Sequence, residues 1–92
     1  MKRYSAAKLT CDYDAYTDVL YATFKRVAAV VCRETPSGFL VRHARASGEI
    51  VGVTILDYVD QFGPGVNEIQ IDADPAFVVE VNPVDCRATA FG

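Results

Sequence analysis

The sequence predicts a mainly β fold, with α+β as the alternative, built as a small antiparallel sheet or roll of five to seven short strands with at most one short helix. Short runs rich in β-branched and aromatic residues recur along the chain. Glycine and proline turns separate these runs at short intervals. A chain of 92 residues can form only one hydrophobic core of useful size, so residues 1–92 are expected to be a single domain.

The first strand is expected at residues 8–13, where apolar and polar side chains alternate. The segment at residues 19–32 allows two interpretations. A helix would gather five apolar residues on one face, namely Leu20, Phe24, Val27, Ala28 and Val31. Two strands would instead break near Lys25 and Arg26, and the valine, tyrosine and threonine content of the segment favours strands.

An acidic turn at residues 14–18 separates these two segments, because aspartate side chains bond to local backbone groups and favour turns. We expect Asp14 to tie the turn through its side chain. Asp18 is expected to cap the short turn that leads into the next strand. Tyr13 and Tyr21 are expected to pack against each other as an aromatic pair on adjoining strands.

From residue 35 onward, turn signals and strand signals alternate. The expected order is a turn at 36–38, a strand at 39–44, a turn at 45–48, a long strand at 49–58, a loop at 61–65, and strands at 66–73 and 75–81. The Asp74-Pro75 step could instead open a short helix. Gly48 is expected to have the positive φ that a hairpin turn requires, and Gly52 is expected to mark a bulge or a close backbone neighbour.

The strands expected at residues 19–24 and 50–56 are apolar on both faces. An antiparallel sheet with one face in water would instead alternate apolar and polar residues. Both faces therefore need a cover, which either the C-terminal strands or a second chain would supply. In a chain of this size the pattern favours a homo-oligomer, a dimer or larger.

Cysteine usage and hydropathy narrow the function classes. Cys11, Cys32 and Cys86 are widely spaced and odd in number, which argues against a disulfide framework or a thiolate zinc site and favours three small buried thiols. The chain has no apolar run of the roughly 20 residues needed to span a bilayer. Its basic start is not followed by the apolar stretch of a secretory signal. We therefore expect a cytoplasmic protein without membrane contact.

Two blocks of the sequence resemble a small bacterial family named domain of unknown function 2283. The blocks are YDAYTDVLY and SGEIVGVTILD, and the matching positions are Tyr13, Asp14, Asp18, Leu20, Tyr21, Gly48, Val51, Gly52, Ile55, Leu56 and Asp57. The resemblance covers residues 9–60, as a family-like β core, and implies a compact bacterial β module with two strands at 19–32. Ala15 departs from the family pattern, which usually has proline there, and so does the basic hairpin near residue 43. Residues 61–92 lie outside the resemblance, as an acidic C-terminal extension.

Signals for catalysis and cofactors are weak. From Asp12 the spacing of aspartates is similar to a calcium loop, but the glycine and the final glutamate of such a loop are missing. His43 is the only histidine, and nothing in the local sequence pairs it with a particular cysteine. We therefore expect no catalytic residue, no bound metal and no cofactor. The alternative is a small metal-binding protein or enzyme that uses carboxylates at Asp12, Asp14 and Asp18.

The charge is divided unevenly, because residues 1–46 carry +4 and residues 47–92 carry −7. The acidic net charge of −3 argues against nucleic-acid binding. In the strand at 66–73 the alternation points Ile69 and Ile71 inward, which makes Glu68, Asp72 and Asp74 a candidate partner-binding surface. We predict a non-enzymatic module that acts by protein–protein contact and self-association. The sharpest form of this hypothesis is an antitoxin-like neutraliser of a small basic protein.

Overall fold

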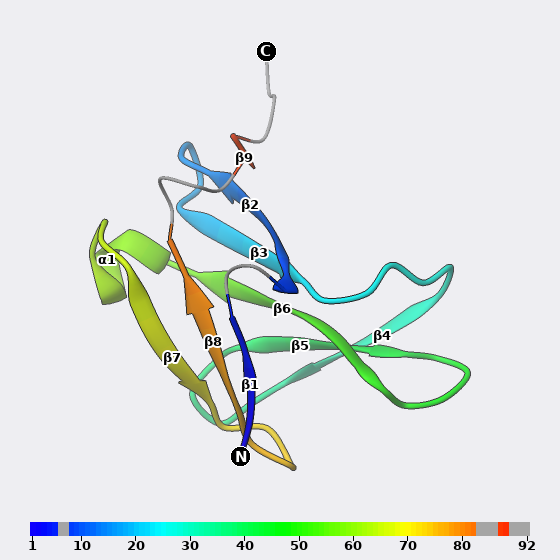
Figure 1. Cartoon of the computed structure of the whole chain (residues 1–92). Coiled ribbons are helices and arrows are strands. Elements are labelled where there is room, and N and C mark those ends of the chain that lie inside the picture. The colour runs from blue at the N-terminus through cyan, green and yellow to red at the C-terminus, as the bar shows by residue number, and fades with distance from the viewer. Residues whose placement is uncertain (6–7, 83–86, 89–92) are drawn as a thin grey trace.

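A computed structural model describes residues 1–5, 8–82 and 87–88 and confirms the mainly β fold (Figure 1). The strands are β1 (Lys2–Tyr4), β2 (Thr10–Asp14), β3 (Val19–Thr23), β4 (Val30–Glu34), β5 (Leu40–Ala44), β6 (Ile50–Leu56), β7 (Asn67–Ile71), β8 (Phe77–Val81) and β9 (Arg87–Ala88). One short helix, α1 (Tyr58–Phe62), lies between β6 and β7. Strands β1 and β9, each at most three residues long, are not among the strands expected from the sequence.

The strands form two sheets (Figure 1). The larger sheet has the strand order β4-β5-β6-β3-β2-β9, and the smaller sheet has the order β1-β8-β7. The pairs between strands close in the sequence are antiparallel. Only the pairs that involve β1 or β9, at the two ends of the described chain, are parallel. Figure 1 shows β7, β8 and β1 together as one layer across the larger sheet.

The ambiguous segment at residues 19–32 forms two strands and no helix. The backbone N–H groups of Phe24 and Lys25 both donate to the carbonyl oxygen of Val51, at 2.8 and 3.2 Å. Two successive donors on one acceptor make a bulge, which ends the pairing of β3 with β6. The chain then leaves the sheet and returns as β4 at its edge, so the break occurs at the lysine and arginine where the sequence predicts it.

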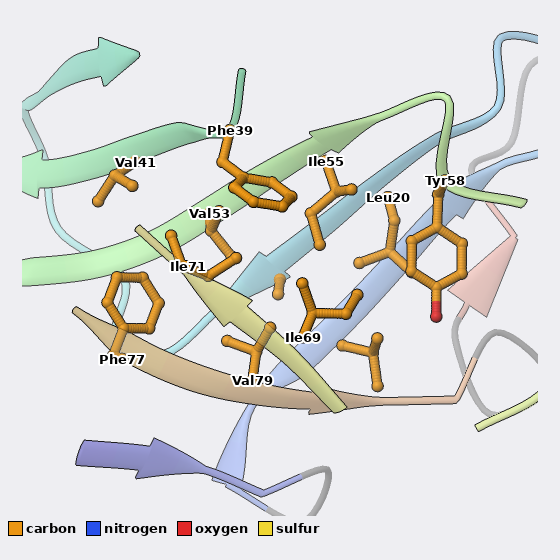
Figure 2. Close-up of a cluster of buried hydrophobic side chains, with 12 residues drawn as sticks. Leu20, Phe39, Val41, Val53, Ile55, Tyr58, Ile69, Ile71, Phe77 and Val79 are labelled. Carbon is orange, nitrogen blue, oxygen red and sulfur yellow. The ribbon is translucent and has the colours of Figure 1, made fainter. Parts of the chain in front are cut away.

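The hydrophobic core fills the space between the two sheets. Its fully buried side chains come from both layers: Leu20, Val41, Val53 and Ile55 from the larger sheet, and Ile71, Val79 and Val81 from the smaller one. Figure 2 shows the labelled side chains of the two sheets pointing toward each other, with Val41 and Phe77 at one end of the cluster and Tyr58 at the other. Residues 67–81 thus supply five of the twelve residues of the buried core cluster, and Ile69 and Ile71 point inward as predicted.

Helix α1 differs from the sequence prediction. The strand expected at residues 49–58 ends at Leu56, because Asp57 adopts a left-handed conformation with φ 51° and turns the chain. Tyr58 is then completely buried, and its hydroxyl oxygen accepts a hydrogen bond from the Asn67 side chain at 2.9 Å. The short helix therefore takes up the beginning of the segment that was expected to be a loop. No helix forms at Asp74, where the chain passes into β8.

The expectation of three buried thiols is wrong at two positions. Cys11 takes part in a disulfide bond. Cys32 is free but exposed. Cys86 lies outside the described residues. Within the described part of the chain, α1 is far too short to cross a bilayer, and no other segment forms a long apolar helix.

Candidate functional site

Asp18 caps helix α1 and not the turn into β3, which corrects the sequence prediction. Its carboxylate accepts hydrogen bonds from the backbone N–H groups of Val59 at 2.8 Å and Asp60 at 3.1 Å. Its own carbonyl oxygen accepts a third from the N–H of Tyr58 at 3.0 Å. These are the N–H groups that a helix leaves without intrahelical partners. Asp57, at the formal capping position, makes no such side-chain bond.

Tyr13 shares this cap. Its hydroxyl group donates a hydrogen bond to the Asp18 carboxylate at 2.6 Å, and its ring packs edge to face with Tyr58 at 6.2 Å between centroids. The hydrogen bond to the carboxylate raises the pKa of Tyr13 to about 12 and lowers the pKa of Asp18. The predicted pairing of Tyr13 with Tyr21 is wrong. Tyr21 lies opposite Asp12 in the register of β2 and β3, so the two tyrosines face opposite sides of the sheet.

The remaining carboxylates of the acidic turn do not converge into a metal site. Asp14 is buried, and its carboxylate accepts hydrogen bonds from the N–H groups of Tyr16 at 3.0 Å and Thr17 at 3.4 Å, the role that the sequence predicts. Asp18 already accepts three hydrogen bonds through its side chain. In the described ranges no three acidic, histidine or cysteine side chains are placed to hold a metal ion together. The turn fixes the position of α1 against β2.

The three acidic residues proposed to bind a partner have different surroundings. Glu68 lies on the exposed face of the smaller sheet, where it forms an ion pair with Arg3 at 2.8 Å. Asp72 accepts a hydrogen bond from the backbone N–H of Ser37 at 2.9 Å, and its bond with Thr35 is the main cause of its lowered pKa. Asp72 therefore holds the turn between β4 and β5. Only two of the three carboxylates remain for recognition.

The two glycines singled out by the sequence have clear roles. Gly48 has φ 74°, as expected for the turn between β5 and β6. Gly52 has a close neighbour, because a Cβ atom there would lie 2.7 Å from Cζ of Arg42 and 2.8 Å from the carbonyl oxygen of Ala22. The β5 strand also shifts register between Arg42 and His43. Glycine and the irregular β5 together let the Arg42 side chain lie flat across β6.

The position of Arg42 does not follow from the sequence. Arg42 belongs to the basic hairpin near residue 43, but its side chain lies on the outer face of the larger sheet, where Arg42 pairs with Gly52 on β6 and Cys32 on β4. Its Nη2 donates to the carbonyl oxygen of Ala22 at 2.7 Å and to Oγ1 of Thr23 at 3.1 Å. Its Nε is buried, and no described residue accepts a hydrogen bond from it.

A hollow of about 490 Å³ surrounds the Arg42 side chain on this outer face. Strand side chains and the segment after β3 line it, namely Asp12, Tyr21, Thr23, Lys25, Arg26, Val27, Val30, Arg42 and Val51. The smaller sheet packs on the opposite face, so it does not cover this one. The wall therefore combines three basic side chains, one acidic side chain and a tyrosine ring.

Among the described strands, β4 is an edge of the larger sheet, because β5 is its one hydrogen-bonded neighbour there. All five residues of β4 are exposed, including Val30 at 45 % and Val31 at 37 %. The N–H of Thr35 donates to Phe39 and the carbonyl oxygen of Ala29 accepts from Arg45, so the odd-numbered residues direct their backbone groups toward β5. The alternation of an antiparallel pair then directs the backbone groups of residues 30, 32 and 34 outward.

Comparison with family models, with curated proteins and with solved structures finds no match to this chain. The likeness to the domain of unknown function 2283 family therefore stays a prediction. The chemistry of the described residues is the basis for assigning a function. Two features lack a complete structural explanation: the open β4 edge and the hollow at Arg42.

Proposed function

We propose that the protein is a β module that acts by protein–protein contact and forms a dimer through β4. The observation that carries the proposal is that all five residues of this edge strand are exposed, two valines among them. Natural proteins protect edge strands with charges, proline or a covering segment, because an open edge pairs readily with another chain. The two charges of β4, Arg33 and Glu34, lie at its C-terminal end, which leaves the first three residues apolar and exposed, as in a strand that pairs with a partner strand.

A second copy fits this edge by antiparallel pairing about a two-fold axis at Val31. In that register Val31 lies opposite its own counterpart, and residue 30 of each copy lies opposite residue 32 of the other. Residues 30 and 32 carry the outward backbone groups, so they exchange the hydrogen bonds, while the two Val31 residues form a non-hydrogen-bonded pair. The charged Arg33 and Glu34 fall opposite Ala29 and Ala28 of the other copy, which avoids like charges at the centre.

Backbone substitution at β4 tests the dimer. Cys32→Pro removes an outward N–H group that β5 does not use, and edge strands tolerate proline at such positions. We expect the wild-type protein and the matched control Cys32→Ser to have twice the chain mass of 10.0 kDa in light scattering, and Cys32→Pro to be a folded monomer. A wild-type monomer, or a Cys32→Pro dimer, would contradict the proposal.

A disulfide scan tests the register. In a non-hydrogen-bonded antiparallel pair the two Cα atoms lie about 4.5 Å apart, within the range that a disulfide can bridge. The Val31→Cys variant, made with Cys32→Ser, should therefore form a covalent dimer on mild oxidation. Glu34→Cys, made in the same background, places its thiols far from the axis and should not. Equal crosslinking of both variants would show random collision and not the proposed pairing.

The smaller sheet favours a second candidate, a basic protein as partner. Glu68 lies directly opposite Glu80 across β7 and β8, and Arg3 on β1 forms an ion pair with Glu68 at 2.8 Å. A basic partner would bring further positive charge to these two carboxylates, as the antitoxin-like hypothesis requires. In a pull-down from the native cell, a small basic partner should be lost with Glu68→Lys but retained with Glu49→Lys, which makes an equal charge change on another face. Equal retention by both variants would exclude this face as the binding surface.

A further inference from the structure

We propose that the hollow at Arg42 binds a small molecule through an oxyanion, either a phosphate or a carboxylate group. This site lies on the outer face of the larger sheet and needs neither the β4 dimer nor a basic protein partner. The hollow of about 490 Å³ falls within the roughly 300–1,000 Å³ that is usual for small-molecule sites.

The Arg42 guanidinium group is held in a fixed position before any ligand arrives. It lies over Gly52, where a Cβ atom would come within 2.7 Å of its Cζ atom. Nη2 is anchored by the Ala22 carbonyl oxygen and the Thr23 hydroxyl group. A fixed guanidinium loses little conformational entropy on binding, and its planar set of N–H donors matches the oxygens of a carboxylate or a phosphate.

The positive charge of Arg42 has no ion-pair partner among the described residues. Both acceptors of its hydrogen bonds are neutral oxygens, and neither of the two ion pairs in the described part of the chain includes it. Burial lowers the pKa of the guanidinium group, and Cys32 and Asp12 nearby act against this effect. A half-buried cation that is bonded only to neutral groups attracts an anion more strongly than a solvated one, because less water screens it.

The walls of the hollow add charge and an apolar surface. Arg26 and Lys25 follow the bulge at the end of β3, which brings both side chains to the rim. Lys25 forms an ion pair with Glu49 at 3.3 Å. We therefore expect Arg26 to be the second residue, after Arg42, that contacts the oxyanion. Tyr21, which is 37 % exposed, and Val27 also line the hollow. The arrangement fits an anionic head group attached to a flat or apolar body.

The test is a titration of the isotope-labelled protein, followed through its backbone amide resonances, at constant ionic strength. The probes are inorganic phosphate, phenyl phosphate and benzoate, with chloride as the reference ion. We expect saturable shifts in β3, in the segment that follows it and at residue 42. Saturation by phenyl phosphate alone identifies a phosphate head group, and saturation by benzoate alone identifies a carboxylate. If none of the three probes shifts the amide resonances more than chloride does, the proposal is wrong.

Three variants give the test its specificity. Arg42→Gln and Arg26→Gln should each weaken binding by about tenfold, the effect of losing one charge-assisted hydrogen bond. Arg33→Gln removes the same charge from the opposite face of the larger sheet and should leave the affinity unchanged. Equal weakening by Arg33→Gln would show a general charge effect and refute the site. Arg26 lies outside the strands, so its variant decides the question if Arg42→Gln is poorly folded.

Discussion

Replacing Asp18 by alanine should be the most damaging single change outside the core. The carboxylate accepts hydrogen bonds from Tyr13, Val59 and Asp60, which belong to two elements more than 40 residues apart in sequence. Asp18 also has φ 56°, a left-handed conformation that aspartate tolerates better than alanine. The substitution therefore removes the cap of α1 and the link of α1 to β2, and it strains the turn.

The expected loss can be worked out from these contacts. A helix cap contributes typically about 1 kcal/mol, and a hydrogen bond such as that of Tyr13 contributes about 1 kcal/mol. Alanine in the left-handed region costs roughly a further 1 kcal/mol. Together these effects lower the free energy of unfolding by about 3 kcal/mol. For a domain of this size that corresponds to a fall in melting temperature of roughly 12 to 24 °C.

Asp57 offers a matched control, because it has φ 51° but makes no capping bond through its side chain. Asp57→Ala should therefore cost only the backbone strain, about 1 kcal/mol. Urea denaturation of both variants, followed by circular dichroism, measures the two free energies of unfolding. Equal losses in Asp18→Ala and Asp57→Ala would show that the three hydrogen bonds of Asp18 contribute nothing, and the assignment of the cap would then fail.

Three further predictions concern single contacts. Because the pKa of Tyr13 is raised from 10.0 to about 12, its contribution is complete below pH 10 and is lost as the pH rises through 12. Urea denaturation across this range should show a fall in stability that is absent in Tyr13→Phe; the same fall in both would refute the link. Gly48→Val should cost about 1–2 kcal/mol from its backbone conformation alone, because nothing lies within 4 Å of the added Cβ atom, and a neutral result in thermal denaturation would contradict this. Asp72→Ala should lower the melting temperature more than Asp74→Ala, because only Asp72 bonds to the turn between β4 and β5; equal melting temperatures would show that this bond is not needed.

Much of the fold follows from local patterns. Alternation predicts β2 and β7, and the positive φ of Gly48 follows from its position in a hairpin turn. The helix α1 is not predictable in this way, because its cap comes from Asp18 and its buried anchor, Tyr58, packs against Tyr13. Both contacts join residues that only the tertiary fold brings together. The sequence therefore indicates that Asp18 has a structural role but not which element it serves.

The candidate sites are even harder to predict from the sequence than helix α1. The aspartates that begin at Asp12 and the basic residues near His43 suggest candidate sites, but charge along the chain does not reveal which face of a sheet a residue occupies. Arg42 pairs with Cys32, and Arg33 pairs with Val41. The two arginines therefore belong to neighbouring pairs of β4 and β5 and lie on opposite faces of the sheet. The signal that was available is Gly52, a glycine in the interior of a β-branched strand, which marked a close neighbour without identifying it.

The environment of Arg42 concentrates several costs in one place. A glycine in a strand interior is less stable than alanine by roughly 0.5–1 kcal/mol, β5 loses its regular register there, and Nε of Arg42 is buried without an acceptor among the described residues. Stability alone would favour a regular strand with a threonine or valine in place of Gly52. Local costs of this kind are expected where a function requires them.

This reasoning gives one more prediction, which separates function from stability. Arg42→Gln removes a desolvated charge and keeps one side-chain donor for the Ala22 carbonyl oxygen, so the free energy of unfolding should change by less than about 1 kcal/mol. Oxyanion binding should nevertheless weaken by about tenfold. A large loss of stability, measured by urea denaturation, would mean that Arg42 is held in place to support the sheet. In that case Gly52 and the register shift in β5 would serve the pairing of β5 with β6, and the proposal of a ligand site in the hollow would be wrong.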